Sequence, residues 1–371
     1  MHICFLTSAL VHLFGLVVNL TPRPLLAGEG AYFLFFINCI YCIKRISVLM
    51  SNYPSHAHFH TLIRRKAGLT CTSAFPPHSP NSLIFAKNFL MADIQQLEKI
   101  ASQVRRDIVR QVFNCQSGHP GGSLGCADFL VALYFDAMQH DPAFHMNGAG
   151  EDLFFLSNGH ISPVWYSVLA RSGYFPVQEL NTFRKINTRL QGHPTTAEHL
   201  PGVRMASGSL GQGMSVGIGA ALAKKLNGDH HLVYTLHGDG ELQEGQIWEA
   251  AMFAAHKQVD NIICTVDWNG QQIDGPTKKV MDLGDLHAKF SAFGWDIVSL
   301  EKGNDMTSVV AALAEAKSRT GKGKPVMILM KTAMGSGVDF MEGSHEWHGI
   351  APNKEQLEKA MAQLEETLGD F

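Results

Sequence analysis

From residue 91 to residue 371, the chain alternates between two kinds of hydrophobic pattern. Some stretches place apolar residues three or four positions apart, as on one face of a helix. Others are short and almost continuously apolar, which is typical of strands buried in a parallel sheet. The helical pattern covers residues 94–114, 123–138, 161–172, 211–226, 244–258, 306–319 and 354–367, and the strand pattern covers residues 231–237, 261–267, 295–300 and 325–331.

The order of these elements predicts the fold. From residue 231 onward the order is strand, helix, strand, loop, helix, strand, helix, strand, which specifies a parallel sheet. We therefore expect an α/β fold in which a doubly wound parallel sheet is flanked by helices. In such a sheet, ligands bind outside the carboxyl ends of the strands. Two polar residues, Asp239 and Asn269, directly follow two of the expected strands.

Residues 1–90 do not share this pattern. They hold seven Lys or Arg against a single acid, and their two apolar runs, 3–18 and 31–43, are shorter than the roughly 20 residues of a membrane-spanning helix. A signal or membrane segment, a transit-like leader, or sequence upstream of a true start at Met91 would each explain this composition. We favour the last, because a regular amphipathic helix begins directly after Met91. The expected domain is therefore 91–371.

The composition narrows the class of protein. The chain is 46% hydrophobic and 17% charged, which leaves ample apolar material for a large core. Its formal net charge of -3 gives no sign of a nucleic-acid partner. The cysteines that follow Met91, namely Cys115, Cys126 and Cys264, are odd in number and far apart, which fits a reducing compartment. We expect a cytoplasmic protein that binds neither nucleic acid nor a membrane.

The stretch "HGDGELQEG" carries the clearest candidate chemistry. Asp239 lies between two glycines, and the 28 residues that separate Gly240 from Asn269 make one helix and one strand. Parallel neighbours would bring Asp239 and Asn269 to one edge of the sheet. A carboxylate and an amide oxygen are too few to enclose a cation, but they suit Mg²⁺ or Ca²⁺ that takes further oxygens from a diphosphate and water. Gly-Asp-Gly alone is an ordinary turn, so the spacing to Asn269 decides this interpretation. Glu241 receives no role.

A glycine-rich stretch and four histidines extend the candidate site. "SGSLGQG" (207–213) stands at the start of an expected helix, where backbone N–H groups can seat a ligand, although close helix packing would also use glycine. Its glycines do not fit the dinucleotide-binding fingerprint. Each of His119, His160, His193 and His348 adjoins glycine or proline in an expected loop. A single loop histidine is usually solvated, but four in this setting favour a shared catalytic role.

These motifs together resemble the transketolase family, specifically its amino-terminal, thiamine diphosphate-binding section. The stretches that carry the resemblance occur in the order of the family: "NCQSGHPGGSLG", "FLSNGH", "LQGHP", "GSLGQG", "GDGELQEGQIWEA", "DWNGQQIDG" and "FMEGSHEWHG". The resemblance covers the chain from about Met91 to the end. It implies the thiamine diphosphate-binding fold of the diphosphate type.

The resemblance also implies roles for individual residues. The ligands of the divalent metal would be Asp239, the side chain of Asn269 and the backbone carbonyl of Gln271. The contacts to the diphosphate would come from Gly240, His160 and His348, and those near the aminopyrimidine from Gly208, Ser209 and Leu210. The residues lining the substrate channel and moving protons would be His119, His193 and His348. Ser209 departs from the family, which often has proline there.

The same resemblance suggests how the protein works. A full transketolase continues with a pyrimidine-binding domain and a carboxyl-terminal domain, whereas this sequence ends at Phe371. We therefore expect the amino-terminal subunit of a split transketolase of the pentose phosphate pathway, paired with a separate carboxyl-terminal chain as α2β2. It would transfer a two-carbon ketol unit from a ketose phosphate to an aldose phosphate. The alternatives are a subunit of a deoxyxylulose phosphate synthase-like ketol transferase and a non-catalytic cofactor-binding subunit.

Overall fold

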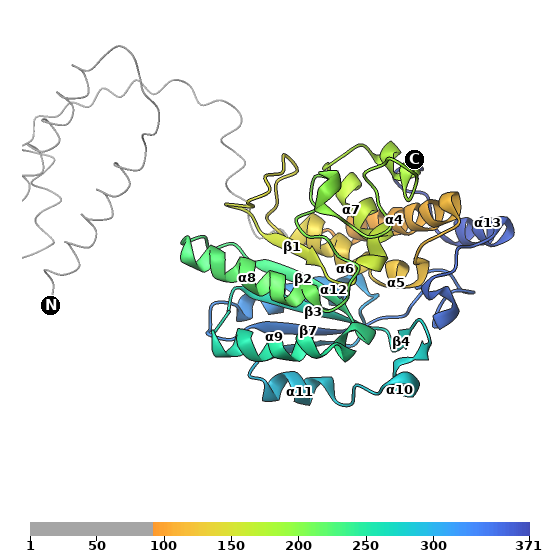
Figure 1. Cartoon of the computed structure of the whole chain (residues 1–371). Coiled ribbons are helices and arrows are strands. Elements are labelled where there is room, and N and C mark those ends of the chain that lie inside the picture. Colours follow the sequence, from red (N-terminus) through yellow and green to blue (C-terminus); the bar gives the residue numbers. More distant parts are fainter. Residues whose placement is uncertain (1–91) are drawn as a thin grey trace, which may run out of the picture. The chain divides into compact units, whose positions relative to one another are not determined.

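A computed structural model describes residues 92–371, which form one compact unit. The expected leader and the start at Met91 lie outside the described residues. The centre of the unit is a five-stranded parallel sheet with the order β1-β2-β3-β7-β6 (Figure 1). Its strands, in chain order, are β1 (Leu153–Leu156), β2 (Val233–Gly238), β3 (Ile262–Trp268), β6 (Asp296–Leu300) and β7 (Val326–Lys331).

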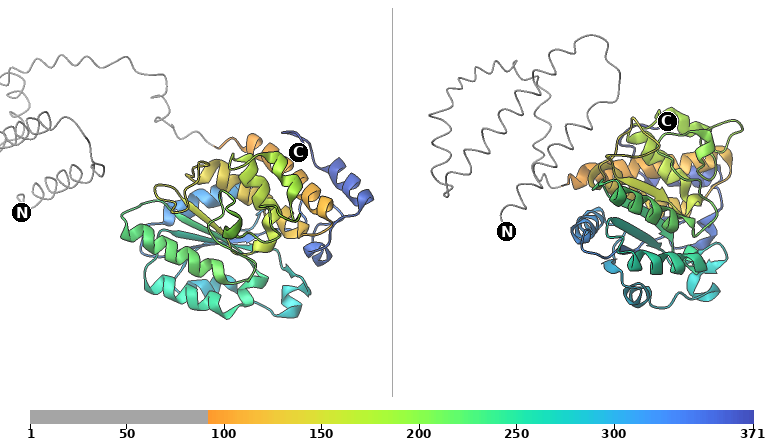
Figure 2. Two further views of the ribbon diagram at one scale, coloured as in Figure 1. Left: turned by 45° about the horizontal axis from the view of Figure 1, so that its top comes forward. Right: turned by 60° about the vertical axis from the view of Figure 1, so that its left-hand side comes forward.

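Helices cover both faces of this sheet (Figure 2). Side chains that alternate along each strand enter two separate apolar clusters: in β1, Phe154 and Leu156 enter one, and Leu153 and Phe155 enter the other. The first cluster is covered by α4 (Ile94–Cys115), α6 (Ala127–Ala132), α7 (Ser162–Arg171) and α12 (Met306–Arg319). The second is covered by α8 (Gln212–Leu226), α9 (Gly245–His256) and α11 (Leu286–Ala292). The expected α/β fold with a doubly wound parallel sheet is confirmed.

Most of the expected elements begin and end within two residues of their predicted limits, but two helices differ, and several short elements were not expected. The edge strand β1 was not expected, because its four residues are too few to show a period. The helix expected at 123–138 begins at Pro120, a residue suited to a first helical turn, and is divided into α5 (Pro120–Gly125), α6 and a π-helical turn (Leu133–Ala137). The last helix, α13, covers only Lys354–Gln363.

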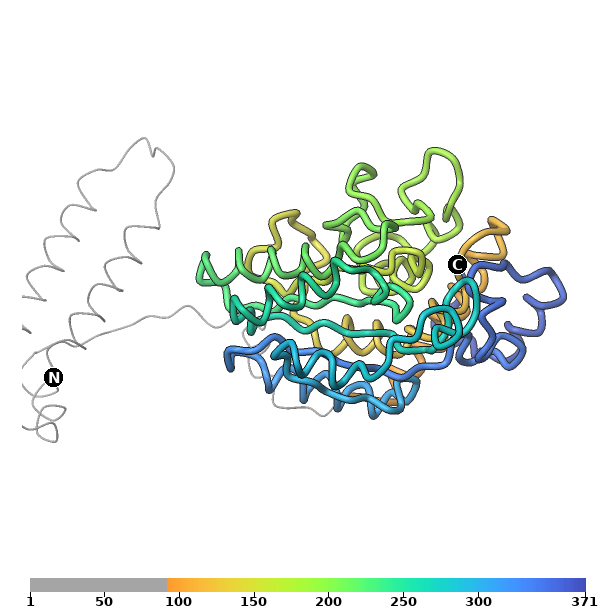
Figure 3. Tube along the Cα trace, turned by 60° about the horizontal axis from the view of Figure 1, so that its bottom comes forward, coloured from red at the N-terminus to blue at the C-terminus, as the bar shows by residue number. Residues whose placement is uncertain are grey.

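The connections after β3 and β7 meet at one end of the molecule. The connection after β3 contains β4 (Gln271–Gln272), β5 (Gly275–Pro276) and α10 (Thr277–Val280). It contacts the 3₁₀ turn His345–His348, which follows β7 (Figure 3). That turn also contacts α5, so three segments far apart in sequence are brought together beside the carboxyl ends of the strands. Of the helices within residues 92–371, none combines the length and the apolar character that crossing a membrane requires.

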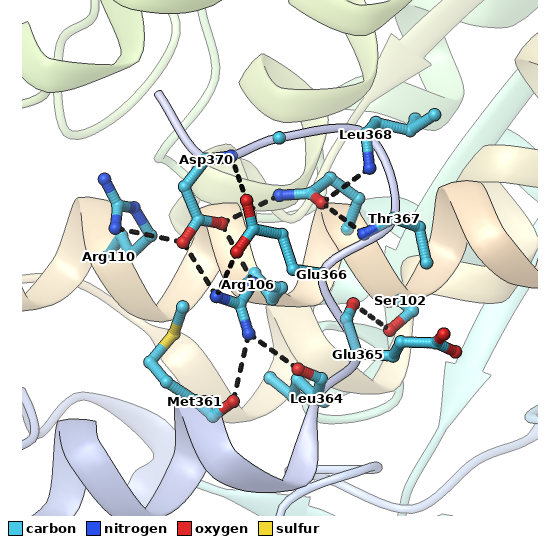
Figure 4. A network of polar contacts seen from close by, with 12 residues as sticks. Ser102, Arg106, Arg110, Met361, Leu364, Glu365, Glu366, Thr367, Leu368 and Asp370 are labelled. Atoms are coloured by element: carbon cyan, nitrogen blue, oxygen red, sulfur yellow. Dashed lines mark hydrogen bonds and ion pairs between the residues drawn. The ribbon is translucent and has the colours of Figure 1, made fainter.

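The tail after α13 lies along α4 (Figure 4). Arg106 donates to the carbonyl oxygens of Met361 and Leu364 and pairs with Asp370 at 2.7 Å. The side chain of Gln103 accepts from the backbone N–H groups of Thr367 and Leu368 and donates to Asp370. These bonds fix residues 364–370 to the first long helix of the domain.

Candidate active site

The register of two central strands sets the position of the candidate metal ligands. Strands β2 and β3 pair so that Gly238 is the partner of Asp267. Asp239 and Asn269 therefore leave the sheet at the same edge, as their spacing in the sequence predicts. The two loops touch, because the backbone N–H of Gly270 donates to Asp239 Oδ2 at 2.7 Å.

Asp239 is buried at this edge, with only 1% of its surface exposed. Burial, and then the neighbouring carboxylate of Asp267, raises the pKa of Asp239 to about 7, although two backbone N–H groups, from Gly270 and Gly240, act against the shift. A bound divalent cation would supply the positive charge that this carboxylate needs in order to stay ionised. The electrostatic environment thus favours a cation at Asp239.

Asn269 is held in a fixed orientation by a residue that the sequence interpretation did not include. Its Nδ2 donates to Asp267 at 2.9 Å, and its Oδ1 accepts from the backbone N–H of Gln271, also at 2.9 Å. Asp267 is itself buried in β3 and accepts from the hydroxyl of Thr332. Its place two residues before Asn269, on the same side of the strand, is the signal that could have identified it.

Apart from Asp239, the ligands of a metal at this edge would be neither acidic side chains nor histidines. Within the described part of the chain, there is no group of three or more His, Cys, Asp or Glu side chains arranged to hold a metal ion. Asp239 is the sole carboxylate among the expected ligands, so amide, carbonyl, phosphate and water oxygens would complete the shell. Such a set is suited to a hard cation, either Mg²⁺ or Ca²⁺.

The four histidines named from the sequence converge above this edge. His119 is the central member: its ring centroid lies 5.1 Å from that of His160, 5.4 Å from His348 and 6.2 Å from His193. The rings of His160 and His348 are 5.0 Å apart. Four separate loops contribute these side chains, which explains why the sequence alone did not predict their contacts.

All four imidazoles are biased toward their neutral form. Burial, followed by the neighbouring histidines and Arg184, lowers the pKa of His119 to about 3. Burial also lowers the pKa values of His160, His193 and His348. Neutral imidazoles at pH 7 can each donate one hydrogen bond and accept another, and they can take up a proton from a substrate hydroxyl.

A cavity of about 250 Å³ lies between the metal edge and the histidines. Its lining includes His119, His160, Gly208, Gly240, Asn269 and His348. Leu210 and Gln271 also line it, whereas Ser209 is exposed and His193 lies beside His119 outside the lining. Cavities that bury most of an organic ligand usually measure about 300–1,000 Å³. This cavity is smaller, which fits a surface that covers only part of its ligand.

Several polar atoms in the cavity wall are buried without a hydrogen-bond partner. They are His119 Nδ1, Asn158 Oδ1 and Gln271 Oε1. Buried polar groups are normally paired, because an unpaired one costs about 1–3 kcal/mol. Unpaired atoms from three separate loops in one cavity wall therefore favour a polar ligand there.

Glycines allow the glycine-rich loop to approach this cavity closely. Gly208 has φ of +138°, and a Cβ atom there would lie 3.1 Å from the ring of His193. At Gly213, in the first turn of α8, a Cβ atom would lie 2.4 Å from the Cβ of Ser157. Close packing therefore explains Gly213, whereas Gly208 lies against His193 and also lines the cavity.

Glu241, which the sequence interpretation left without a role, lies in the centre of the loops. It is 2% exposed and accepts hydrogen bonds from the hydroxyl of Ser157, the N–H of Gly211 at 2.8 Å and the N–H of Gly238 at 3.0 Å. Burial disfavours its charge, but the adjacent His237 and these donors outweigh that effect and lower its pKa. The pKa of His237 is correspondingly raised to about 9, against the effect of burial. The spacing of four positions between His237 and Glu241 was the signal in the sequence that could have indicated this pair.

A second hollow, of about 420 Å³, lies beside the beginning of α4. The charged side chain of Arg171 in its wall is already bonded to Asp107 at 2.8 Å. No unpaired buried polar atom and no histidine belongs to its lining. The chemistry of the described residues therefore gathers in the smaller cavity.

Comparison with known proteins identifies the family. The family described as "Transketolase, thiamine diphosphate binding domain" matches residues 96–369. The chain belongs to the transketolase family. The resemblance drawn from the sequence motifs is thereby confirmed, and the matched residues include the whole cavity.

Two relatives match this transketolase family member over nearly their whole length. The 6-deoxy-6-sulfo-D-fructose transketolase subunit SqwG of Clostridium sp. (strain MSTE9) is 40% identical over 270 residues, which cover 72% of this chain and 96% of the relative. An apulose-4-phosphate transketolase subunit of Actinobacillus succinogenes is 38% identical over 274 residues, which cover 73% and 96%. Both are named as subunits.

Solved transketolases share the fold but are longer. A transketolase from Pichia stipitis in complex with sedoheptulose-7-phosphate aligns with a TM-score of 0.68 at 33% identity, over 72% of this chain and 40% of that chain. The transketolase from Campylobacter jejuni aligns with a TM-score of 0.67 at 34% identity, over 73% and 43%. The chain thus spans less than half the length of these two transketolases.

Proposed function

We propose that this chain is the thiamine diphosphate-binding subunit of a two-chain transketolase. It would transfer a two-carbon ketol unit from a ketose phosphate to an aldose phosphate. The observation that carries the proposal is the cavity itself, of about 250 Å³, in which a buried acidic edge for a cation faces His119, His160 and His348. The match to 96% of the length of two relatives that are named as transketolase subunits supports it.

The residues present fit the cofactor. Asp239, Asn269 and the carbonyl of Gln271 would hold Mg²⁺ or Ca²⁺, and the unpaired atoms of the cavity wall would meet polar groups of the ligand. Gly240, His160 and His348 would contact the diphosphate, and Gly208, Ser209 and Leu210 the aminopyrimidine side. When bound, thiamine diphosphate supplies the nucleophilic carbon to which the two-carbon unit is transferred.

The histidines would carry out the proton transfers of this chain. His119, His193 and His348 would bind the hydroxyl groups of the sugar, and their neutral rings would accept and return protons. His193 would be positioned for the hydroxyl next to the donor carbonyl. The depressed pKa values of all three support this role, because an imidazolium could not act as a base.

An exposed apolar surface formed by α8 and α9 is the feature that supports the proposal of a partner chain. Val216, Met252 and Phe253 are 39%, 58% and 45% exposed on these neighbouring helices. The carboxylates of Glu244 and Glu249 border them and are also exposed. We propose that the separate carboxyl-terminal subunit covers this surface in an α2β2 assembly. The free cysteines Cys115, Cys126 and Cys264 support a cytoplasmic location.

Reconstitution tests this proposal. The purified chain with thiamine diphosphate and Mg²⁺ should give negligible transfer alone and measurable transfer after the carboxyl-terminal subunit is added. The donors tested should be xylulose 5-phosphate together with the two sugars named for the relatives, apulose 4-phosphate and 6-deoxy-6-sulfofructose. Robust turnover by the chain alone would contradict the two-chain enzyme.

Two further assays test the alternative functions. An assay with pyruvate as the donor distinguishes a deoxyxylulose phosphate synthase. Full activity of a complex that carries His193→Ala would favour a non-catalytic subunit.

A further inference from the structure

Three loops that line the cavity meet at one buried side chain. The first contains Ser157 and leads into Asn158 and His160. The second contains Leu210 and Gly211. The third begins at Gly238, the last residue of β2, and continues into Asp239. Glu241 accepts a hydrogen bond from a donor in each of these loops. Eighty-four positions separate Ser157 from Glu241, so this contact belongs to the tertiary structure.

The carboxylate of Glu241 is fully used. One oxygen accepts from the Ser157 hydroxyl and the Gly211 N–H, and the other accepts from the Gly238 N–H. The ring of His237 lies 3.5 Å from the first oxygen and is held from its other side by the hydroxyl of Thr235 at 2.7 Å. A carboxylate offers about four acceptor sites, and the three donors together with His237 occupy them.

A relay extends this contact into α8. The hydroxyl of Ser157 donates to Glu241 and accepts from the N–H of Gly213 at 3.0 Å. The first turn of α8 is therefore bonded to Glu241 twice, directly at Gly211 and through Ser157 at Gly213. The absence of a Cβ at Gly213 makes this approach possible.

We propose that Glu241 is a positioning residue for the cofactor, which fixes the three cavity loops in one arrangement before the cofactor binds. The inference rests on the proposed function, because it assigns that arrangement to thiamine diphosphate and its metal. Glu241 is itself part of the cavity lining, but among the described residues the hydrogen-bond partners of its carboxylate are Ser157, Gly211, Gly238 and His237, and none of these is an expected metal ligand or a cavity histidine. Its effect reaches them through the neighbouring residues Asp239, His160 and Leu210.

The test compares two buried carboxylates. Glu241→Gln keeps the size of the side chain but replaces one acceptor oxygen with an NH₂ group that faces an N–H donor. Asp107→Asn is the matched control, because Asp107 is likewise buried and accepts from a serine hydroxyl, that of Ser167, at 2.7 Å. It lies on α4, outside the cavity lining. Ser157→Ala is a milder variant that removes one donor and leaves the carboxylate.

Amide hydrogen exchange of the full chain without ligand reads out the loops directly. In Glu241→Gln, the amides of residues 157–160, 208–213 and 238–240 should all exchange at least about tenfold faster than in the wild type, and in Ser157→Ala the first two segments should. Asp107→Asn should leave all three segments unchanged. Unchanged exchange in Ser157→Ala and Glu241→Gln, or faster exchange confined to residues 238–240, would overturn the inference. If Glu241→Gln does not fold, Ser157→Ala alone decides.

Calorimetric titration with thiamine diphosphate and Mg²⁺ then links the loops to the cofactor. The Kd of Glu241→Gln should rise at least about tenfold, and that of Ser157→Ala about threefold, while Asp107→Asn keeps the wild-type Kd. A wild-type Kd in a variant with faster loop exchange would overturn the positioning role. Absence of binding by the wild-type chain, both alone and in complex with the carboxyl-terminal subunit, would instead contradict the proposed function, and the exchange measurement distinguishes that outcome from a failure of this inference.

Discussion

Gly238, the last residue of β2, lies directly opposite Asp267 in β3. This pairing places the next residue of the first strand, Asp239, beside the loop that begins at Asn269, and the Gly270 N–H bond at 2.7 Å joins the two. A candidate metal edge therefore follows from strand register. Apart from the pairing of β2 with β3, no other long-range contact is needed to bring Asp239 and Asn269 together.

Replacement of Asp239 by alanine should remove metal-dependent cofactor binding. Loss of residues that only support a metal ligand already lowers affinity about 10- to 100-fold, so loss of the ligand should raise the Kd for thiamine diphosphate in excess Mg²⁺ at least about 100-fold. Isothermal titration calorimetry measures this change. Glu301→Gln, which alters an exposed carboxylate paired with Lys331, is the control and should bind as the wild type does. An unchanged Kd in Asp239→Ala would exclude this edge as the metal site.

Two glycines of α8 should respond oppositely to the same substitution. Gly213→Ala should destabilise the chain by about 2 kcal/mol, because the new Cβ would lie 2.4 Å from Ser157. Gly219→Ala should stabilise it by about 0.5–1 kcal/mol, because that position has no atom within 4 Å of the added Cβ and alanine restricts the unfolded chain. Urea unfolding measures both free energies. Equal effects would show that α8 does not pack on Ser157 as described.

The buried histidines should make stability depend on pH below neutrality. The pKa of His119 is about 3 in the folded chain and near 6.5 in the unfolded chain. As the pH falls from 7.5 to 5, the unfolded chain takes up a proton that folded His119 does not. The contribution of His119 to the free energy of unfolding should therefore fall, with a limit of about 1.4 kcal/mol per pH unit for one proton.

The variant His119→Asn isolates this contribution. The raised pKa of Asp239, about 7, acts in the opposite direction, because its proton favours the folded chain and is lost as the pH rises. That contribution is common to both proteins and cancels in their difference. The stability of the wild type relative to His119→Asn should thus decline steadily between pH 6.5 and 5 in urea unfolding with a metal chelator. A constant difference would contradict a neutral His119.

The tail contacts of Figure 4 should contribute measurably to stability. Arg106→Ala deprives Asp370 and the carbonyl oxygen of Leu364 of a hydrogen-bond donor. Both side chains of the ion pair are largely buried, because Arg106 is 10% and Asp370 19% exposed. We expect a loss of about 2 kcal/mol in the free energy of unfolding. Lys359→Ala breaks an exposed ion pair with Glu355 and should leave the unfolding curve unchanged. Equal stability of the two variants would contradict a fixed tail.

Those parts of the site that depend on local sequence patterns could be predicted from the sequence. Asp239 and Asn269 follow strands whose apolar runs were evident, so their shared edge could be derived. Gly208 and His193 also occur in recognisable motifs. The four-residue strand β1 gave no period, and for that reason the loop at Ser157 could not be placed beside the others in advance.

The residues that sequence reasoning missed act through tertiary contacts. Glu241 was visible in the motif, but its donors lie in loops 30 and 84 positions away. Asp267 was the last residue of an expected strand and received no role, although its bond to Asn269 orients the expected ligand. Such roles depend on which loops the fold brings together, and one sequence does not contain that information in local form.

The position of β7 has a consequence for biosynthesis. It is the last strand of the described sheet, yet it pairs with β3 on one side and β6 on the other. During translation, both of those strands must wait with unpaired backbone edges until Lys331 has left the ribosome. Unpaired edges are prone to association with other chains, so the nascent protein passes through a stage at which chaperone protection of β3 and β6 should matter most.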